Sequence, residues 1–265
     1  MVRADLPMWR RWWLFVVTAA VILFLIVPIF IVIPVSFSDS KYLRFPPEAY
    51  SLRWFENYWN SPEWLAATRA SLTAAILTVL VATPLGIAAA YGLHSMRSRM
   101  TPWIQLVLIL PMLVPGILIA IGVFYIYIRL KIVNTMFGIV LAHTLLALPF
   151  VVLMMQAAFR TFDFRQEQAA MSLGAPRLNA FLVVTLPQLR ISVISAALFA
   201  FIISLDEVVI GLFVAGGGNT LLTRKMFVSL RDAVDPTVAA ISTLFIVISI
   251  CLLGCLAFVR RRQPH

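Results

Sequence analysis

Charged side chains are scarce in this sequence of 265 residues. Only 12% of the residues are Asp, Glu, Lys or Arg, whereas 62% are hydrophobic. A soluble domain of this size carries about 25% charged residues to cover its core. The composition therefore excludes an ordinary soluble protein and is typical of a polytopic membrane protein.

Cysteine, histidine and nucleotide-binding signatures are also nearly missing. Cys251 and Cys255 lie four residues apart, where they share a helix face and pack as small apolar residues. His143 stands alone in an apolar run, so we expect it to make a hydrogen bond between helices. The glycine run at 215–219 lacks the Gly-Lys-Ser/Thr ending of a Walker A loop. We expect no catalytic residue, metal site or cofactor in this chain.

Basic residues outnumber acidic ones, and the formal net charge is +10. The basic residues are scattered at the edges of apolar runs and form neither a stripe nor a basic helix. A nucleic-acid partner would require such a surface. Membrane topology explains the charge better, and we expect no nucleic-acid partner.

Six apolar stretches are long enough, or nearly so, to cross a bilayer, which takes about 20 residues. They cover residues 12–35, 64–93, 103–128, 136–159, 191–214 and 237–259. The first stretch is too long for the core of a secretory signal, and no cleavage site follows it. The sequence predicts an all-α polytopic membrane protein with six transmembrane helices, and residues 1–265 form a single transmembrane domain.

The distribution of Lys and Arg predicts the orientation. Twelve of the twenty-one basic residues fall on the side that carries both termini, eight fall on the other side, and Arg69 falls within a span. Cytoplasmic loops carry the excess of basic residues. We expect a multi-pass protein of the bacterial inner membrane with both termini cytoplasmic, surrounded by membrane lipid.

The fourth connection, residues 160–189, is a short polar segment between long apolar runs. Asp163 is a candidate N-cap, with Gln166 three residues on, and Gly174 is a natural helix stop. Pro176 is well placed to open a second helix that Pro187 would end. The segment therefore predicts two short helices on the cytoplasmic membrane surface, where a soluble partner could dock.

This segment resembles the cytoplasmic "EAA" loop of permease subunits of binding-protein-dependent ABC importers. The family pattern is Glu-Ala-Ala, three residues, Gly, nine residues, Ile, one residue, Leu-Pro. Here the matching positions hold Gln168, Ala169, Ala170, Gly174, Val184, Leu186 and Pro187. Two positions differ from the pattern: Gln168 replaces Glu, with Glu167 just before it, and Val184 replaces Ile. We call residues 160–189 the EAA segment.

The resemblance implies both a fold and a set of partners. The fold is that of a type I ABC importer permease (MetI-like). The partners are a second homologous permease subunit, an ATPase dimer that binds ATP and Mg²⁺, and an extracytoplasmic solute-binding protein. In the family the EAA loop fits a cleft on the ATPase. Ala169, Ala170 and Gly174 would then allow close helix approach, and Gln168 or Glu167 would offer a polar contact.

Further segments are similar to the spermidine/putrescine importer permeases of the PotC type. They lie at residues 51–59, 71–86, 204–214 and 225–244. The resemblance therefore covers most of the chain and implies a polyamine as substrate. The predicted external loop, residues 36–62, is rich in aromatic residues and is a candidate docking surface for an extracytoplasmic partner.

Asp206 and Glu207 lie within the fifth predicted span. A carboxylate at the centre of a transmembrane helix costs about 2.5 to 3.5 kcal/mol. Two functions are open: a buried ion pair, for which Arg69 is a candidate partner, or contact with a protonated amine in transit. We expect one acid to line a cavity and the other to pair elsewhere, because adjacent residues of a helix point about 100° apart.

The sequence thus predicts a permease subunit of an ATP-driven importer of polyamines or a related amine. One alternative is a relative that imports another small solute, such as 4-aminobutyrate, an opine or an anion. Asp206 and Glu207 disfavour an anion. A second alternative, a free-standing channel or secondary transporter, would act without ATP.

Overall fold

The computed structural model describes residues 12–96 and 98–261, without the side chains of 252, 253 and 255–261. Within these ranges the chain is helical and contains no strand, only an isolated bridge between Ser38 and Tyr50. The helical prediction is confirmed. The chain divides into two compact units, residues 1–61 with 229–265 and residues 62–228.

The first unit contains α1 (Trp12–Ser36), α2 (Arg53–Asn60) and α13 (Thr237–Arg261). Helix α13 packs against α1 and α2. The side-chain amide of Asn57 in α2 donates a hydrogen bond to the Thr237 hydroxyl at 2.8 Å, which ties α2 to the start of α13.

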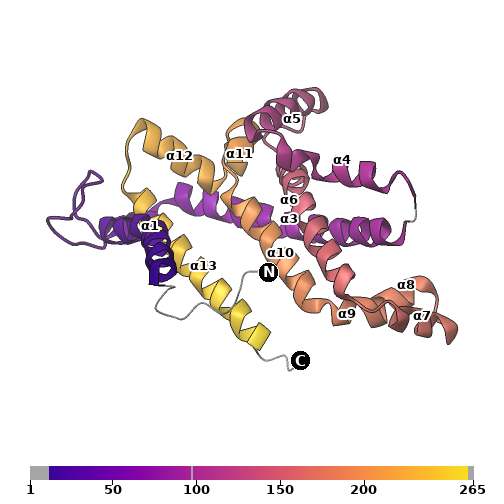
Figure 1. Cartoon of the computed structure of the whole chain (residues 1–265). Coiled ribbons are helices and arrows are strands. Elements are labelled where there is room, and N and C mark those ends of the chain that lie inside the picture. The colour runs from indigo at the N-terminus through magenta and orange to yellow at the C-terminus, as the bar shows by residue number, and fades with distance from the viewer. Residues whose placement is uncertain (1–11, 97, 262–265) are drawn as a thin grey trace. The chain divides into compact units, whose positions relative to one another are not determined.

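The second unit is built around three long helices, α3 (Pro62–Ser95), α6 (Met136–Thr161) and α10 (Arg190–Asp206), which pack against one another (Figure 1). Small residues allow this close approach. A Cβ atom added to Gly86 of α3 would overlap the Val151 side chain of α6, at 2.7 Å from its Cβ. Each of these helices carries fully buried alanines, among them Ala74 of α3, Ala147 of α6 and Ala200 of α10.

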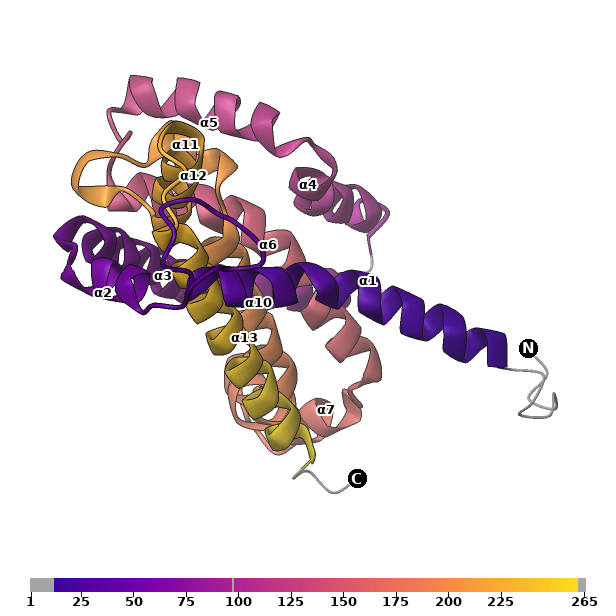
Figure 2. The same ribbon diagram turned by 90° about the vertical axis from the view of Figure 1, so that its left-hand side faces the viewer.

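Shorter helices complete the second unit. Helix α4 (Thr101–Leu113) packs on α6, and α5 (Gly116–Leu130) packs on α11 (Val209–Val214). The EAA segment contains α7 (Arg165–Ser172), α8 (Arg177–Ala180), the π-helical turn η2 (Phe181–Thr185) and α9 (Leu186–Gln188). A 3₁₀ turn, η3 (Gly217–Asn219), precedes α12 (Leu222–Asp232). Helix α7 lies at the opposite end of the unit from α5 and α11 (Figures 1 and 2).

Two of the predicted spans are not single helices. The third is split at Val114 and Pro115 into α4 and α5, which meet at 100°. Pro115 has no N–H, and its extended backbone, with ψ of 130°, ends the helical path. The fifth is split after Asp206, and Glu207 and Val208 separate α10 from α11. The assumption of one continuous helix through both acids is therefore wrong.

Three described helices are long and apolar enough to cross a membrane by themselves, namely α1, α3 and α6. Up to five spans result if two bent pairs, α4 with α5 and residues 177–188 with α10, are each counted as one. The described part of α13 is a shorter apolar helix. The helices agree with six crossings without fixing that number.

Candidate functional site

The EAA segment folds as two short helical parts joined by a tight turn. Gly174 has φ of +93°, which an L side chain rarely adopts. Its N–H donates to the Met171 carbonyl at 3.0 Å, and the N–H of Ala175 donates to the Ala170 carbonyl at 3.1 Å. This pair of bonds is a Schellman cap, so the predicted stop at Gly174 is confirmed.

Of the other predicted helix signals, Pro176 lies where expected, whereas the helix boundaries near Asp163 and Pro187 differ by one or two residues. The Asp163 carboxylate accepts the N–H of Arg165 at 3.0 Å, but Phe164 occupies the cap position of α7. Pro176 precedes α8 as expected. Pro187 does not end the second part, which continues through η2 and α9 to the start of α10. Pro187 occupies one of the first positions of α9, where a proline without an N–H is tolerated.

Glu167 points into the protein, although it stands in the middle of a polar segment. Only 4% of its surface is exposed. The Tyr91 hydroxyl of α3 donates to Oε1 at 2.5 Å, and the Thr185 hydroxyl of η2 donates to Oε2. The Arg177 guanidinium donates through Nε to the Tyr91 hydroxyl at 3.1 Å. Glu167 therefore ties α7 both to η2 and to the end of α3.

Aromatic rings surround this polar cluster. The ring centroid of Tyr91 lies 4.6 Å from that of Phe181 in η2 and 5.9 Å from that of Phe159 in α6. The His94 ring stacks on Phe164 with centroids 4.3 Å apart. Such aromatic pairs stabilise the packing of helices beyond the gain from burying their apolar surface. These contacts join the EAA segment to the ends of both α3 and α6.

The other residues that the EAA pattern singles out in α7 and in the turn after it are exposed or half-buried. Gln168 and Ala169 are exposed, and Ala170 is half-buried. Leu173 is 90% exposed, and Met171 is exposed beside it. Large apolar side chains in this position are typical of a protein contact surface. We call Gln168, Ala169, Met171, Leu173 and Gly174 the docking face.

The last two predicted coupling residues lie elsewhere. Leu186 packs against the hydrophobic core between α3, α6 and α10, whereas Pro187 is exposed. Neither belongs to the docking face. Leu186 holds the segment to these core helices.

Tyr91, Thr185 and Arg177 are functional residues that the sequence pattern did not reveal. Tyr91 is 76 positions from Glu167, and Thr185 is 18 positions from it. No local spacing rule joins such distant positions. The family resemblance offered Glu167 as a polar contact for the ATPase, and no local signal indicated that its side chain is buried.

Asp206 and Glu207 both line a cavity of about 310 Å³ at the two helix breaks. Its walls include Val114, Gly116 and Phe150. The expectation that one acid turns away is wrong, because the break after Asp206 removes the helical 100° offset. Interrupted helices at membrane depth typically line binding sites, since their free backbone groups need polar surroundings.

Glu207 also stabilises the broken span. Its Oε1 accepts the N–H of Ile210 at 2.7 Å, which caps the start of α11. Its backbone carbonyl accepts the Thr223 hydroxyl at 2.7 Å. None of the ion pairs found in the described part of the chain joins Arg69 to either acid.

His143 makes the predicted contact between helices. Its Nδ1 lies 2.7 Å from the Ser204 hydroxyl of α10, and the residue is 1% exposed. Across residues 12–96 and 98–261, no group of three or more His, Cys, Asp or Glu could hold a metal ion.

Comparisons with known proteins agree on one family. Residues 82–263 match the family described as "Binding-protein-dependent transport system inner membrane component". The spermidine/putrescine transport system permease protein PotC of Haemophilus influenzae is 29% identical, covering 97% of this chain and 98% of that protein. The putrescine transport system permease protein PotI of Escherichia coli K12 is 30% identical, covering 91% and 88%.

The fold also matches a solved structure. A bacterial alginate ABC transporter, solved in complex with an alginate pentasaccharide-bound periplasmic protein, contains a chain with a TM-score of 0.70. The alignment covers 96% of this chain and 95% of that one, at 15% identity. This similarity supports the fold alone.

Proposed function

Because the chain belongs to the family of binding-protein-dependent transport system inner membrane components, we propose that it forms half of the translocation pathway of an ATP-driven polyamine importer. A second, homologous permease subunit forms the other half. Two ATPase subunits bind ATP and Mg²⁺, and an extracytoplasmic protein delivers the substrate. The sequence similarity to PotC and PotI supports a polyamine as the substrate.

The observation that carries the proposal is the construction of the EAA segment. Its docking face exposes Gln168 on α7 and Leu173 just after it, while Glu167 holds α7 to α3. Closure of the ATPase dimer displaces α7, and the Tyr91 and Phe159 contacts carry this displacement to α3 and α6. The packed helices can adopt two arrangements, one open to each side of the membrane. Switching between them gives the pathway alternating access. In this arrangement both chain termini are cytoplasmic.

The cavity at the helix breaks is the proposed substrate pathway. Protonated amines need carboxylates at membrane depth, and both Asp206 and Glu207 line this cavity. A polyamine carries several separated ammonium groups, so two adjacent acids can neutralise one group while the substrate passes. An importer of another amine would use the same acids, and the solute-binding protein would distinguish the substrates.

Reconstitution tests the proposed function. The chain is purified with the subunits that accompany it and placed in proteoliposomes with its binding protein. We expect spermidine or putrescine uptake that requires both ATP and the binding protein. Uptake by this chain alone, driven by an ion gradient and indifferent to ATP, would instead establish a secondary transporter or channel.

Neutralising the cavity acids tests the substrate pathway. We expect Asp206→Asn and Glu207→Gln each to slow uptake about 30-fold, since losing a desolvated charge partner costs about 2 kcal/mol or more. Gln at 207 can still accept the Ile210 N–H, so α11 stays capped. Asp232→Asn, at an exposed acid paired with Arg231 at 2.7 Å, serves as the control. Normal uptake by both cavity variants would show that neither acid contacts the substrate during transport.

A further inference from the structure

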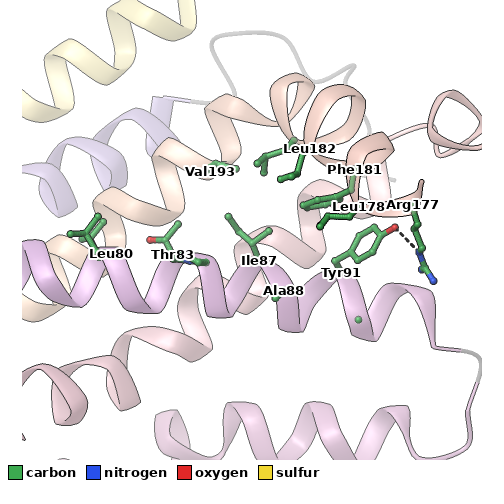
Figure 3. A pocket seen from close by; sticks show the side chains of 14 residues that line it. Leu80, Thr83, Ile87, Ala88, Tyr91, Arg177, Leu178, Phe181, Leu182 and Val193 are labelled. Atoms are coloured by element: carbon green, nitrogen blue, oxygen red, sulfur yellow. Dashed lines mark hydrogen bonds between the residues drawn. The ribbon is translucent and has the colours of Figure 1, made fainter. Parts of the chain in front are cut away.

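A second, larger cavity lies beside α3, away from the two acids. It measures about 820 Å³ and is lined almost entirely by apolar side chains of α3 on one wall and of α8, η2, α9 and α10 on the other. Figure 3 shows the labelled side chains from Leu80 to Tyr91 along α3, with Phe181, Leu182 and Val193 across from them. We call this cavity the α3 groove.

One end of the α3 groove is basic. Arg177 lies there, with its guanidinium carbon 5.3 Å above the centroid of the Tyr91 ring. Its Nε–H bonds to the Tyr91 hydroxyl, which fixes the guanidinium at the mouth (Figure 3). None of the ion pairs between described residues includes Arg177. The groove therefore combines an apolar channel with a fixed cation that no carboxylate pairs with directly.

The length of the groove matches one leaflet of a bilayer. Its lining runs along α3 from Val79 to Gly92, which is about 20 Å at about 1.5 Å per residue. Half of a hydrocarbon core of about 30 Å is about 15 Å. Arg177 belongs to the EAA segment, so the basic end lies at the membrane–water interface and the apolar end at the bilayer centre. Several lining side chains are open to the surroundings, among them Leu80 at 64% and Leu178 at 67% exposure.

We propose that the α3 groove binds an anionic phospholipid of the inner leaflet, with an acyl chain along α3 and the phosphate on Arg177. Basic pockets between transmembrane helices on the cytoplasmic side commonly hold anionic head groups. A phosphate accepts the terminal N–H groups of the guanidinium in a bidentate manner. Since Tyr91 contacts both Arg177 and Glu167, the bound lipid supports the same cluster that holds α7.

Photolabelling tests this site without depending on transport, so its outcome is separate from that of the proposed function. The purified chain, with any subunits that accompany it, is placed in phosphatidylcholine nanodiscs containing phosphatidylglycerol with a diazirine on one acyl chain. We expect adducts on the walls of the groove. A diazirine phosphatidylcholine with identical chains is the head-group control.

Four variants sharpen the test. Arg177→Gln should lower labelling about fivefold, the factor that one basic residue contributes near an anionic surface. Ala88→Trp should abolish it by filling the groove, since Ala88 is an exposed lining residue. Labelling should be unchanged in Arg99→Gln, at an exposed arginine outside the groove, and in Leu85→Trp, at an exposed α3 residue that does not line it.

Two results would overturn the proposal. Equal labelling by both lipids would mean that the groove has no preference for an anionic head group. Absence of groove adducts, together with cross-linking of a photoreactive residue at Leu182 to another subunit, would mean that a protein helix fills it.

Discussion

Replacing Glu167 by alanine is expected to uncouple ATP hydrolysis from transport and to lower the stability of the permease. The substitution leaves the hydroxyls of Tyr91 and Thr185 without their acceptor. Hydrogen bonds to a charged group contribute about 1.5 to 3 kcal/mol each, so we expect a loss of about 3 kcal/mol. The purified complex should therefore melt at a lower temperature and hydrolyse more ATP for each substrate molecule imported.

Gln168→Ala is the matched control for this experiment. Gln168 is the adjacent residue, but its side chain is exposed on the docking face. The Gln168→Ala substitution should leave the melting temperature unchanged and affect only the attachment of the ATPase. The melting temperature of Glu167→Gln should fall between those of the parent protein and Glu167→Ala. The amide oxygen can accept one of the two hydroxyl hydrogen bonds, but the amide nitrogen cannot accept the other. A normal melting temperature for Glu167→Ala would refute the internal role of Glu167.

Replacing Leu173 by aspartate is expected to detach the ATPase while leaving the permease folded. Leu173 is 90% exposed and makes no core contact that the substitution could remove. Burying a leucine at an interface contributes about 2 kcal/mol, so ATPase binding should weaken at least about 30-fold. Co-purification of the ATPase with the permease, at several detergent and salt concentrations, measures this loss.

Leu173→Met controls for the change of shape, because it keeps volume and hydrophobicity. It should retain the ATPase, and both variants should show the melting temperature of the parent protein when assayed as isolated permease. Full ATPase retention by Leu173→Asp would move the attachment surface away from the docking face.

The sequence predicted the helical class, the apolar spans and the position of the EAA segment, since each leaves a local pattern. Hydrophobic runs mark α1, α3 and α6, and Gly174 with Pro176 marks the turn of the EAA segment. These signals act through backbone conformation and burial in lipid. They can be recognised in the sequence without knowing the tertiary contacts.

The broken spans and the direction of Glu167 could not be read in this way. Proline in a transmembrane run can kink a helix or split it, and at Pro115 only packing decides between the two. Glu207 ends α10 because its carboxylate caps the next helix, a contact that the apolar pattern around it conceals. Glu167 turns inward because the hydroxyl of Tyr91, which is far away in the sequence, lies where it can donate a hydrogen bond to the carboxylate.

The cavity of Asp206 and Glu207 arises from the same cause. Its walls come from residues at the break between α4 and α5, from residues at the break between α10 and α11, and from α6. A prediction based on continuous spans therefore identified the two acids but pointed them about 100° apart on one helix.

Cross-linking from position 173 tests most directly whether this membrane protein is driven through its EAA segment. A photoreactive amino acid replaces Leu173 in intact membranes, and another replaces Trp59, an exposed residue of α2 in the predicted external loop. Illumination should join position 173 to the ATPase subunit and position 59 to no ATPase. If position 173 forms no such adduct, or is modified by a membrane-impermeant reagent added outside intact cells, the ATPase does not drive this protein through the EAA segment.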